Sequence, residues 1–359
     1  MIKTDNYCVI MAGGIGSRFW PMSTIKFPKQ FHDILGTGRT MIQQTYDRIS
    51  QLIPSENIFV ITNLEYVELT HQQLPELPKK NIVGEPMMKN TAACNMYMVN
   101  KIADINPKAN VIVLPADHLI LKEQAFLEKV EFAFELASKN DYLITLGIQP
   151  TRPDTGYGYI QYISQKNKQV CKVKTFTEKP NMELAKVFVE AGDFLWNAGI
   201  FIWNVQSIIK AFEKHMPDMT QQFSNCEYNT DRENVCIETI YPKVNKISID
   251  NGILEKAENV YVIPSDLGWS DLGTWTSVFE NAEKDETQNA KSKNVITYNA
   301  HRNIIRLKNN NKVAIVDGLE DYIIVDTEKA LLICPREHDQ QIKDYVLDLK
   351  GLKKGDRFM

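Results

Sequence analysis

Short apolar runs alternate with helix-like stretches across residues 7–148, and this rhythm restricts the fold more than any other feature of the chain. The predicted strands are 7–11, 58–62, 81–83, 109–114 and 143–148, and the predicted helices are 41–50, 64–73, 91–105 and 123–139. Uninterrupted apolar strands separated by helices are typical of a parallel sheet covered on both faces. We therefore expect an α/β fold that binds its ligands at the carboxyl ends of the strands.

The rhythm changes twice further along the chain. From about residue 151, short β-like runs and two helices suggest an insertion that covers the opening of the sheet; the runs are 159–162, 170–176 and 199–203, and the helices 182–191 and 205–214. Strand patterns return at 247–250 and 260–263. After the charged stretch 281–286, short β runs spaced by about ten residues suit a small barrel or a coiled β-solenoid, closed by a helix over 339–349. These runs are 294–298, 303–307, 313–316, 322–325 and 330–333.

Length and composition limit the class of protein. A chain of 359 residues is too long for one ordinary core, so we expect two domains, 1–285 and 290–359. The net charge of −4 argues against a nucleic-acid partner, and the apolar runs are too short to span a membrane. No signal peptide is evident, and the six cysteines form no C-x-x-C pair. We expect reduced, buried thiols in a cytoplasmic protein.

A glycine-rich turn follows the first apolar run, and Arg18 and Lys29 come soon after it. The turn contains Ala12, Gly13, Gly14, Gly16 and Ser17. Glycines let backbone N–H groups close on an anion that a nearby cation then holds, so a nucleotide phosphate is the first ligand to consider. The turn lacks the Gly-Lys-Ser/Thr of a Walker loop, and Phe19 replaces the third glycine of a dinucleotide fingerprint. An ordinary turn with solvated charges is the alternative, but the strand end and both cations favour phosphate binding.

Two carboxylates far apart in the sequence are candidate metal ligands. Asp117 directly follows an apolar strand, and Asp271 lies among glycines and tryptophans. Mg²⁺ prefers such hard oxygen ligands when it bridges substrate phosphates. The alternatives are a helix cap for Asp117 and a turn role for Asp271. His118 is expected to position its neighbours rather than to act as a base, because an ionised phosphate nucleophile needs none.

Polar residues with sugar-binding chemistry lie in the middle of the chain. Glu178 is suited to accept from sugar hydroxyls and Lys179 to meet a phosphate, although both also suit a solvated helix N-terminus. Asn197 both donates and accepts, and Gly158 allows close approach of the backbone. A turn before a strand and a hairpin are the respective alternatives for these last two residues.

Together these stretches resemble the sugar-1-phosphate nucleotidylyltransferases, and within them the mannose-1-phosphate guanylyltransferases. The matching patterns, in chain order, are A-G-G-x-G-[ST]-R-x-x-P…P-K, P-A-D-H, F-x-E-K-P, W-N-[AS]-G and W-x-D-x-G-x-W. Glu85, Pro86, Asn90 and Thr91 match the segment that meets the guanine base in that family. Ser248-Ile249-Asp250, ahead of Glu255-Lys256, also matches. The resemblance covers nearly the whole chain.

The resemblance implies a Rossmann-like catalytic domain, with a mixed, mainly parallel sheet and flanking helices, and a C-terminal left-handed β-helix. It implies transfer of GMP from GTP to α-D-mannose 1-phosphate, with Mg²⁺ on Asp117 and Asp271. By the same resemblance, Arg18 would hold the leaving phosphates, Lys29 would lie near the α-phosphate, and Lys179 would hold the sugar phosphate. Glu178, Asn197 and the Gly158 backbone would meet hydroxyls. We also expect a homodimer, and none of the cupin-type isomerase domain that some bacterial members carry.

Three other functions remain open at this point. The same chemistry on another pair, such as dTTP or UTP with glucose 1-phosphate, is the nearest. A non-catalytic regulatory homologue is disfavoured, because an idle copy has no chemical need for Arg18, Lys29, Asp117, Lys179 and Asp271 together. A nicotinamide-dependent oxidoreductase is disfavoured by Phe19 at the third glycine position and by the lack of an acidic residue clearly ending the second strand.

Overall fold

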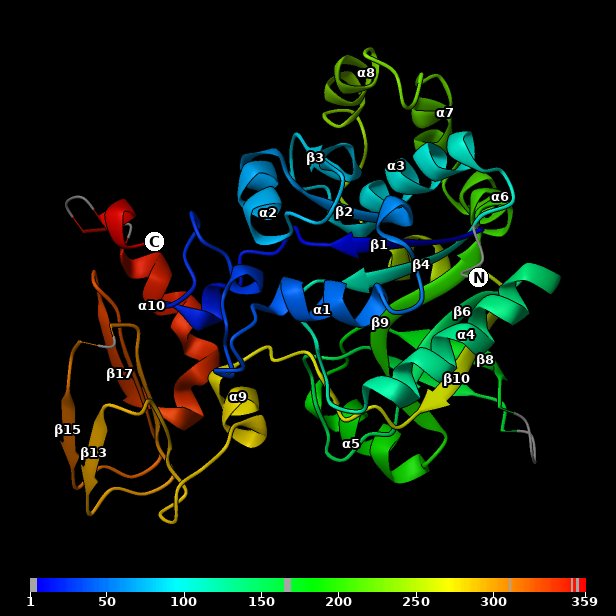
Figure 1. Ribbon diagram of the computed structural model, residues 1–359. Helices are drawn as coiled ribbons and strands as arrows, with labels where there is room; N and C mark the ends of the chain where they lie inside the picture. Colours follow the sequence, from blue (N-terminus) through cyan, green and yellow to red (C-terminus); the bar gives the residue numbers. More distant parts are fainter. Residues whose placement is uncertain (1–4, 165–168, 310, 350, 353–354) are drawn as a thin grey trace. The chain divides into compact units, whose positions relative to one another are not determined.

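The computed structural model describes residues 5–164, 169–309, 311–349, 351–352 and 355–359 (Figure 1). The chain divides into two compact units. The first consists of Met1–Gly13, Thr45–Ala116 and Ile120–Trp269, and the second of Gly14–Gln44, Asp117–Leu119 and Ser270–Met359. The expected boundary at 285–290 falls inside the second unit, so that division of domains stays a prediction. No helix among the described residues is long and apolar enough to cross a membrane.

A nine-stranded sheet forms the centre of the first unit, in the order β3-β2-β1-β4-β9-β6-β10-β8-β7. Its strands are β1 (Asn6–Met11), β2 (Ile58–Asn63), β3 (Ile82–Glu85), β4 (Asn110–Pro115), β6 (Leu143–Ile148), β7 (Tyr159–Tyr162), β8 (Cys171–Thr177), β9 (Phe194–Asn204) and β10 (Val260–Ser265). Strands β3, β2, β1 and β4 are parallel neighbours, as the apolar runs predict. The glycine turn after β1 and Glu85 at the end of β3 therefore come at carboxyl ends of the parallel strands.

Strand β9 corrects the expected insertion over the sheet. It lies antiparallel between β4 and β6, while β10 pairs parallel with β6. Strands β7 and β8 pair with each other and with β9 and β10 at the far side of the same sheet. Strands β7, β8 and β9 are thus part of the main sheet and not an insertion over it. The main sheet is mixed, because it contains both parallel and antiparallel pairs. A buried strand is apolar in either direction, so its composition could not show that β9 runs against its neighbours.

Helices cover both faces of this sheet (Figure 1). On one face, α3 packs against α6 and α7 over a large apolar core that includes Val9, Val111 and Trp203. On the other face, α4 packs against β4, β6, β9 and β10. The helices of the unit are α2 (Val67–Gln73), α3 (Asn90–Ile105), α4 (Glu123–Lys139), α5 (Met182–Ala191), α6 (Val205–His215), α7 (Pro217–Ser224) and α8 (Glu233–Ile240). A further helix, α1 (Met41–Ile49), contains the boundary between the units.

The strand expected at 247–250 is wrong. This segment leads into a wide helical turn, Asp250–Leu254, in which the Glu255 N–H donates to the Asp250 carbonyl at 2.9 Å. Ile253 and Leu254 are buried on its inner side. A Cβ on Gly252 would lie 2.6 Å from Met216 Sδ, so a larger residue there would require the Met216 side chain to move. Ile247 and Ile249, whose spacing suggested a strand, precede this turn, and Ile249 is buried.

In its described part, the second unit contains parallel β-coils and the helices α9 and α10. Sheet β12-β14-β16 is parallel, β17 closes it antiparallel to β16, and β13 pairs parallel with β15. The elements are β12 (Ala290–Lys291), β13 (Val295–Tyr298), β14 (Ile304–Leu307), β15 (Ala314–Asp317), β16 (Tyr322–Asp326), β17 (Leu331–Pro335), α9 (Trp275–Asn281) and α10 (Ile342–Leu349). Parallel pairing of successive coils is the pattern of a β-helix-like domain rather than of an antiparallel barrel. Its left-handedness stays a prediction.

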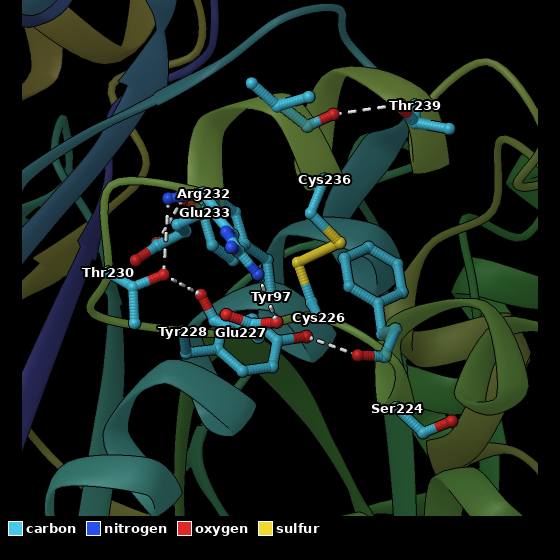
Figure 2. The surroundings of a disulfide bond; sticks show 12 residues. Tyr97, Ser224, Cys226, Glu227, Tyr228, Thr230, Arg232, Glu233, Cys236 and Thr239 are labelled. Carbon is cyan, nitrogen blue, oxygen red and sulfur yellow. Dashed lines mark hydrogen bonds and ion pairs between the residues drawn. A yellow bond between two sulfur atoms is a disulfide. The ribbon is translucent and has the colours of Figure 1, made fainter.

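Two cysteines form a disulfide that the sequence did not predict (Figure 2). Cys226, just after α7, is bonded to Cys236 in α8. The expectation of reduced thiols is wrong for this pair, while Cys8, Cys94, Cys171 and Cys334 are free and buried. Spacing alone did not reveal the pair, because the two cysteines are ten positions apart and a polar loop and the start of a helix lie between them.

Helix α8 is also anchored to α3 by a buried ion pair. Lys101 Nζ donates to both carboxylate oxygens of Glu233, at 2.8 and 2.6 Å, and the Tyr97 hydroxyl donates to the same carboxylate at 2.6 Å. The Asn229 N–H adds a fourth donor at 2.7 Å. These four hydrogen bonds join the loop and α8 to α3, the helix that begins at the expected base-binding segment.

Candidate functional site

The glycine turn packs directly on Lys29 within the second unit. Gly16 has φ +68°, and a Cβ there would lie 2.5 Å from Lys29 Cβ. The position therefore requires glycine both for its backbone conformation and for the close approach of a side chain. At Gly14, by contrast, an added Cβ would have no atom of the described residues within 4 Å. Arg18 follows in a short helical turn, Ser17–Phe19, and is exposed.

Lys29 brings the two predicted metal ligands together. Its Nζ donates to Asp117 Oδ2 at 2.9 Å, to the Asp117 carbonyl at 3.1 Å and to the Asp271 carbonyl at 2.8 Å. The lysine side chain is only 4% exposed. An ammonium has three N–H donors, so each of them has a protein oxygen within hydrogen-bond distance. Residues that are 88 and 242 positions away from Lys29 in sequence thus meet at one cation.

The carboxyl of Asp117 is held in its ionised form. Burial raises its pKa, but the charges of Lys29 and His118 and the hydrogen bond from Lys29 outweigh burial and bring the pKa below its ordinary value. The alternative role as a helix cap is wrong, because α4 begins at Glu123 and Lys122 precedes it. Asp117 therefore offers a charged oxygen ligand.

Asp271 makes the turn contact that was its alternative role and still fits a metal. Its Oδ1 accepts from the Gly273 N–H at 2.9 Å. A Cβ on Gly273 would lie 2.6 Å from Asp271 Oδ2. The Asp271 carboxylate fits in its present position because glycine has no Cβ. Leu272 between them has φ +43°, a strained conformation of the kind often found at functional sites. No group of three or more His, Cys, Asp or Glu side chains suited to a metal occurs in the described part of the chain. A metal on these two carboxylates would take its other ligands from phosphate and water.

A second group of predicted residues meets within the first unit. The Asn197 N–H donates to the Gly158 carbonyl at 2.8 Å, and a Cβ on Gly158 would lie 2.8 Å from Glu178 Oε2. Lys179 Nζ lies 3.0 Å from Glu178 Oε1, and its side chain is 62% exposed. Lys179 has φ +42°, which is strained for a residue with a Cβ. Gly158, Glu178, Lys179 and Asn197 therefore form one polar cluster, called the 158–197 cluster below.

The alternative roles weighed for three of these residues do not match the structure. Helix α5 begins at Met182, and Asn181 caps it by accepting from the Leu184 N–H at 2.9 Å. Glu178 and Lys179 precede that cap and are not in the first turn of the helix. Asn197 lies inside β9, beside an irregularity in the pairing of β9 with β6, and not in a turn before a strand. Such irregularities re-aim side chains and recur next to binding sites.

The residues expected to meet the base gather around the end of β3. Glu85 is buried and accepts from the Tyr241 hydroxyl at 2.8 Å. Burial raises the pKa of Glu85 to about 7, although the Tyr241 hydrogen bond lowers it. A Cβ on Gly13 would lie 3.9 Å from Glu85 Oε2, so the carboxylate approaches the glycine turn. Ala12 lies in the same turn, and its N–H donates to the Ile61 carbonyl.

The side chains of Asn90 and Thr91 accept hydrogen bonds from backbone N–H groups. Asn90 Oδ1 accepts from the Thr91 N–H at 2.8 Å, and Asn90 has φ +66°. Thr91 Oγ1 accepts from the Ile249 N–H at 2.9 Å. Pro86 is half-buried at the end of β3. Thr91 thus joins the start of α3 to the segment that leads into Asp250.

Sequence reasoning missed two polar residues of these clusters, Tyr241 and Asp250. Nothing near Tyr241 in sequence signals a partner for Glu85, since 156 positions separate them. Asp250 lies in a segment that supports the family resemblance, but no role was expected for its side chain. Asn197 Nδ2 donates to Asp250 Oδ1 at 3.0 Å.

The geometry can be compared with known proteins. The Nucleotidyl transferase family model matches residues 7–288, and a MannoseP isomerase/GMP-like beta-helix domain model matches 293–349. The chain belongs to the nucleotidyl transferase family. Nucleotidyltransferases of this family generally use a divalent metal. The Asp117 carboxylate and the backbone carbonyl of Asp271 both contact Lys29, which brings two candidate metal-binding residues to one place.

Curated relatives extend the similarity over nearly the whole chain. Mannose-1-phosphate guanylyltransferase of Escherichia coli is 32% identical over 360 residues, which cover 96% of this chain and 76% of that protein. The alginate biosynthesis protein AlgA of Pseudomonas aeruginosa is 31% identical, covering 95% and 71%. A crystal structure of mannose-1-phosphate geranyltransferase from Thermus thermophilus superposes with a TM-score of 0.85 at 25% identity, covering 96% of this chain and 99% of that one.

Proposed function

We propose that this nucleotidyltransferase transfers GMP from GTP to α-D-mannose 1-phosphate and forms GDP-mannose and pyrophosphate. The observation that carries the proposal is the meeting of Lys29, Asp117 and Asp271, three charged residues far apart in sequence, around one buried ammonium. Relatives at 31–32% identity that carry mannose-1-phosphate guanylyltransferase and alginate-biosynthesis names support this choice of substrates.

The reaction brings two anions together, so charge neutralisation and positioning are the main tasks of the protein. An oxygen of the sugar phosphate attacks the α-phosphorus of GTP, the new P–O bond forms, and the bond to pyrophosphate breaks. Mg²⁺, when bound, would supply positive charge between the phosphates. Asp117 and Asp271 would hold it through hard carboxylate oxygens.

We assign Lys29 a role other than the contact with the α-phosphate that the resemblance implies. Its three N–H groups are within hydrogen-bond distance of oxygens of Asp117 and Asp271, so we assign it to fixing the two aspartates. Arg18 is exposed beside the glycine turn and is suited to hold the departing β- and γ-phosphates with its planar guanidinium. The backbone at Gly14, where an added Cβ meets none of the described atoms, would approach the triphosphate.

Substrate recognition is assigned to residues of the first unit. Glu85, with Pro86 and Asn90, would face the guanine base, whose N1–H and 2-amino groups are donors that a carboxylate accepts. Lys179 would hold the sugar phosphate, because its ammonium is largely exposed. Glu178 and the Gly158 backbone would meet sugar hydroxyls. Homodimerisation stays part of the proposal without a structural argument.

The test is the identity of the product. Purified protein is incubated with Mg²⁺, each of four NTPs and several sugar 1-phosphates, and pyrophosphate release and the nucleotide sugar are measured. We expect GDP-mannose from GTP and mannose 1-phosphate. If another pair is preferred, such as dTTP or UTP with glucose 1-phosphate, the proposed substrates are wrong but the proposed type of reaction is right. No turnover with any pair would favour a non-catalytic homologue.

Asp271→Asn is the matching test of the metal ligands. Loss of one charge that acts in the transition state typically lowers turnover by about 10²–10³. Asp266→Asn is the control, because that carboxylate is exposed and its ion pair with Lys122 lies at the surface. Asp271→Asn with wild-type turnover at low Mg²⁺ would overturn the assignment of Asp271.

A further inference from the structure

Asp250 lies against the 158–197 cluster, and neither the motifs nor the comparisons give it a role. Its Oδ1 accepts from Asn197 Nδ2 at 3.0 Å. Among the described residues, Asn197 is the only one whose side chain donates to it. Burial and the neighbouring Glu178 raise the pKa of Asp250 to about 6. The charge of Glu178 acts on Asp250, so two carboxylates of this region lie near one another.

The Asn197 amide is fixed with its nitrogen toward Asp250. Its Oδ1 accepts from the Gly199 N–H at 3.0 Å and from Thr145 Oγ1 at 3.3 Å. A backbone N–H only donates, so the amide oxygen must face Gly199 and the amide nitrogen must face Asp250. The Gly199 N–H occupies one lone pair of the Asn197 oxygen, and the Thr145 hydroxyl beside it shares its single proton between this oxygen and the Ile200 carbonyl at 3.1 Å. The side chain is therefore better placed to orient Asp250 than to accept from a ligand itself.

The backbone of Asp250 is fixed as well. The preceding N–H, of Ile249, donates to Thr91 Oγ1 at 2.9 Å. The Asp250 carbonyl accepts from the Glu255 N–H at 2.9 Å, which closes a wide helical turn. Single wide turns of this kind occur frequently at functional sites. Two side chains and a closed turn thus hold a carboxylate to which one side chain, among those described, donates.

We propose that Asp250 is a further substrate-binding residue, whose carboxylate accepts a hydroxyl of the sugar 1-phosphate, and that Asn197 is the positioning residue that aims it. This inference rests on the proposed sugar subsite at Glu178 and Lys179. Sugar hydroxyls are donors, and ionised carboxylates accept from them more strongly than neutral groups do. A sugar that lacks the matching hydroxyl leaves the carboxylate unpaired, so Asp250 selects among sugars.

Asp250→Asn tests the proposal, because asparagine keeps an oxygen for Asn197 Nδ2 but removes the charge and replaces the other acceptor oxygen by an NH₂ donor. Steady-state kinetics are measured at pH 8, where the wild-type carboxyl is ionised. We expect the KM for mannose 1-phosphate to rise about 10-fold or more, and the KM for GTP to change less than about twofold. Glu255→Gln is the control, because it makes the same change at an exposed carboxylate of the same turn.

Monodeoxy analogues of mannose 1-phosphate separate binding from a merely structural effect. The wild-type enzyme should lose about 10-fold or more in kcat/KM on the analogue that lacks the hydroxyl bound by Asp250. Asp250→Asn should lose little further on that analogue and more on the others. Asn197→Ala should reproduce the pattern, and the double variant should be no worse than Asp250→Asn alone, because both changes act through one carboxylate.

Two results overturn the inference and can be told apart. If Asp250→Asn leaves the KM unchanged, or lowers activity equally on every analogue, while Lys179→Ala raises the KM for mannose 1-phosphate, then Asp250 does not bind the sugar but the subsite stands. If Lys179→Ala and Glu178→Gln also leave that KM unchanged, the proposed sugar subsite itself is wrong.

Discussion

Lys29 and Lys179, the two lysines that the sequence assigns to phosphates, lie in opposite surroundings. Lys29 in the second unit is 4% exposed and has three oxygen partners, whereas Lys179 in the first unit is 62% exposed and its ion pair is with the adjacent Glu178. A buried ammonium with all its donors used fixes other groups, and an exposed one is able to meet a ligand. One sequence signal, a lysine near a binding motif, therefore covers two physical roles.

Replacement of each lysine by methionine is the most direct test of the difference between Lys29 and Lys179. Lys29→Met leaves the Asp117 carboxylate without its cation. We expect the free energy of unfolding to fall by about 3 kcal/mol, less than for a fully buried pair because Asp117 is 34% exposed. Turnover should fall by about 10²–10³, because Asp117 and Asp271 lose the group that holds them together. Urea unfolding and steady-state kinetics measure the two effects.

Lys179→Met is the matched variant. An exposed ion pair contributes about 0–1 kcal/mol, so the unfolding curve should barely move. The KM for mannose 1-phosphate should rise while kcat with saturating sugar phosphate changes less. The comparison fails if Lys179→Met unfolds as easily as Lys29→Met, or if Lys29→Met keeps its stability and only raises a KM.

The next largest effect is expected from the glycine turn, where Gly14 and Gly16 repeat the same contrast. Gly16→Ala places a Cβ 2.5 Å from Lys29 Cβ and forces alanine into φ +68°. We expect a loss of about 2 kcal/mol, from backbone strain and crowding together. Gly14→Ala meets no atom of the described residues, so its stability should stay within about 0.5 kcal/mol of the wild type.

Kinetics then show whether the turn grips a triphosphate. Gly14→Ala should weaken GTP binding without changing the midpoint of thermal unfolding, because its Cβ occupies space that only a ligand would use. Unchanged kinetics for Gly14→Ala would remove the backbone at Gly14 from the proposed phosphate grip. Loss of stability in Gly14→Ala but not in Gly16→Ala would contradict the packing of Gly16 on Lys29.

Much of the fold followed from the sequence because burial leaves a plain pattern. Strand Leu143–Ile148 and helix Met182–Ala191 agree with the prediction residue for residue. Helices α7 and α8 were missed, because polar residues dominate the segment from Pro217 to Ile240 and the apolar spacing is short. The direction of β9 was also out of reach, since strand direction depends on connections and not on composition.

Motifs indicate some residues of the candidate site, but they do not indicate partners that come from elsewhere in the chain. Asp117, Asp271 and Glu178 could be chosen from the motifs that contain them, although a helix cap, a turn and a helix N-terminus were alternative roles. The role of Lys29 could not, because it depends on two carbonyl oxygens and a carboxylate that the fold brings together. Asp250 was hidden by an apolar run that resembles a strand but folds as a turn.

The smallest expected effect concerns Glu85. The pH dependence of GTP binding shows whether this buried carboxyl accepts hydrogen bonds from the base or only packs in the core. With a pKa of about 7, roughly half of the free protein carries a proton on Glu85 at pH 7. If guanine donors require the ionised form, GTP binding must release that proton. The KM for GTP should then fall about tenfold between pH 6 and pH 8. In Glu85→Gln, the triphosphate of GTP still titrates but residue 85 does not. The difference between the wild-type and variant plots of KM against pH therefore measures the effect of Glu85.

The stability of the protein is a second test of the Glu85 carboxyl. It should change with pH in the opposite direction to GTP binding. Because burial raises the folded pKa of Glu85 above its unfolded value, the protonated form is the stable one, and wild-type stability declines as pH rises through 4.5 toward 7. Glu85→Gln without ligand should therefore be more stable than the wild type at pH 8, by thermal unfolding. Tyr241→Phe removes the donor that lowers the pKa, so the midpoint of the GTP profile should move to higher pH. A midpoint that stays in place would mean that Tyr241 does not control the charge of Glu85, and the contrast between a tuned and a merely buried carboxyl would fail.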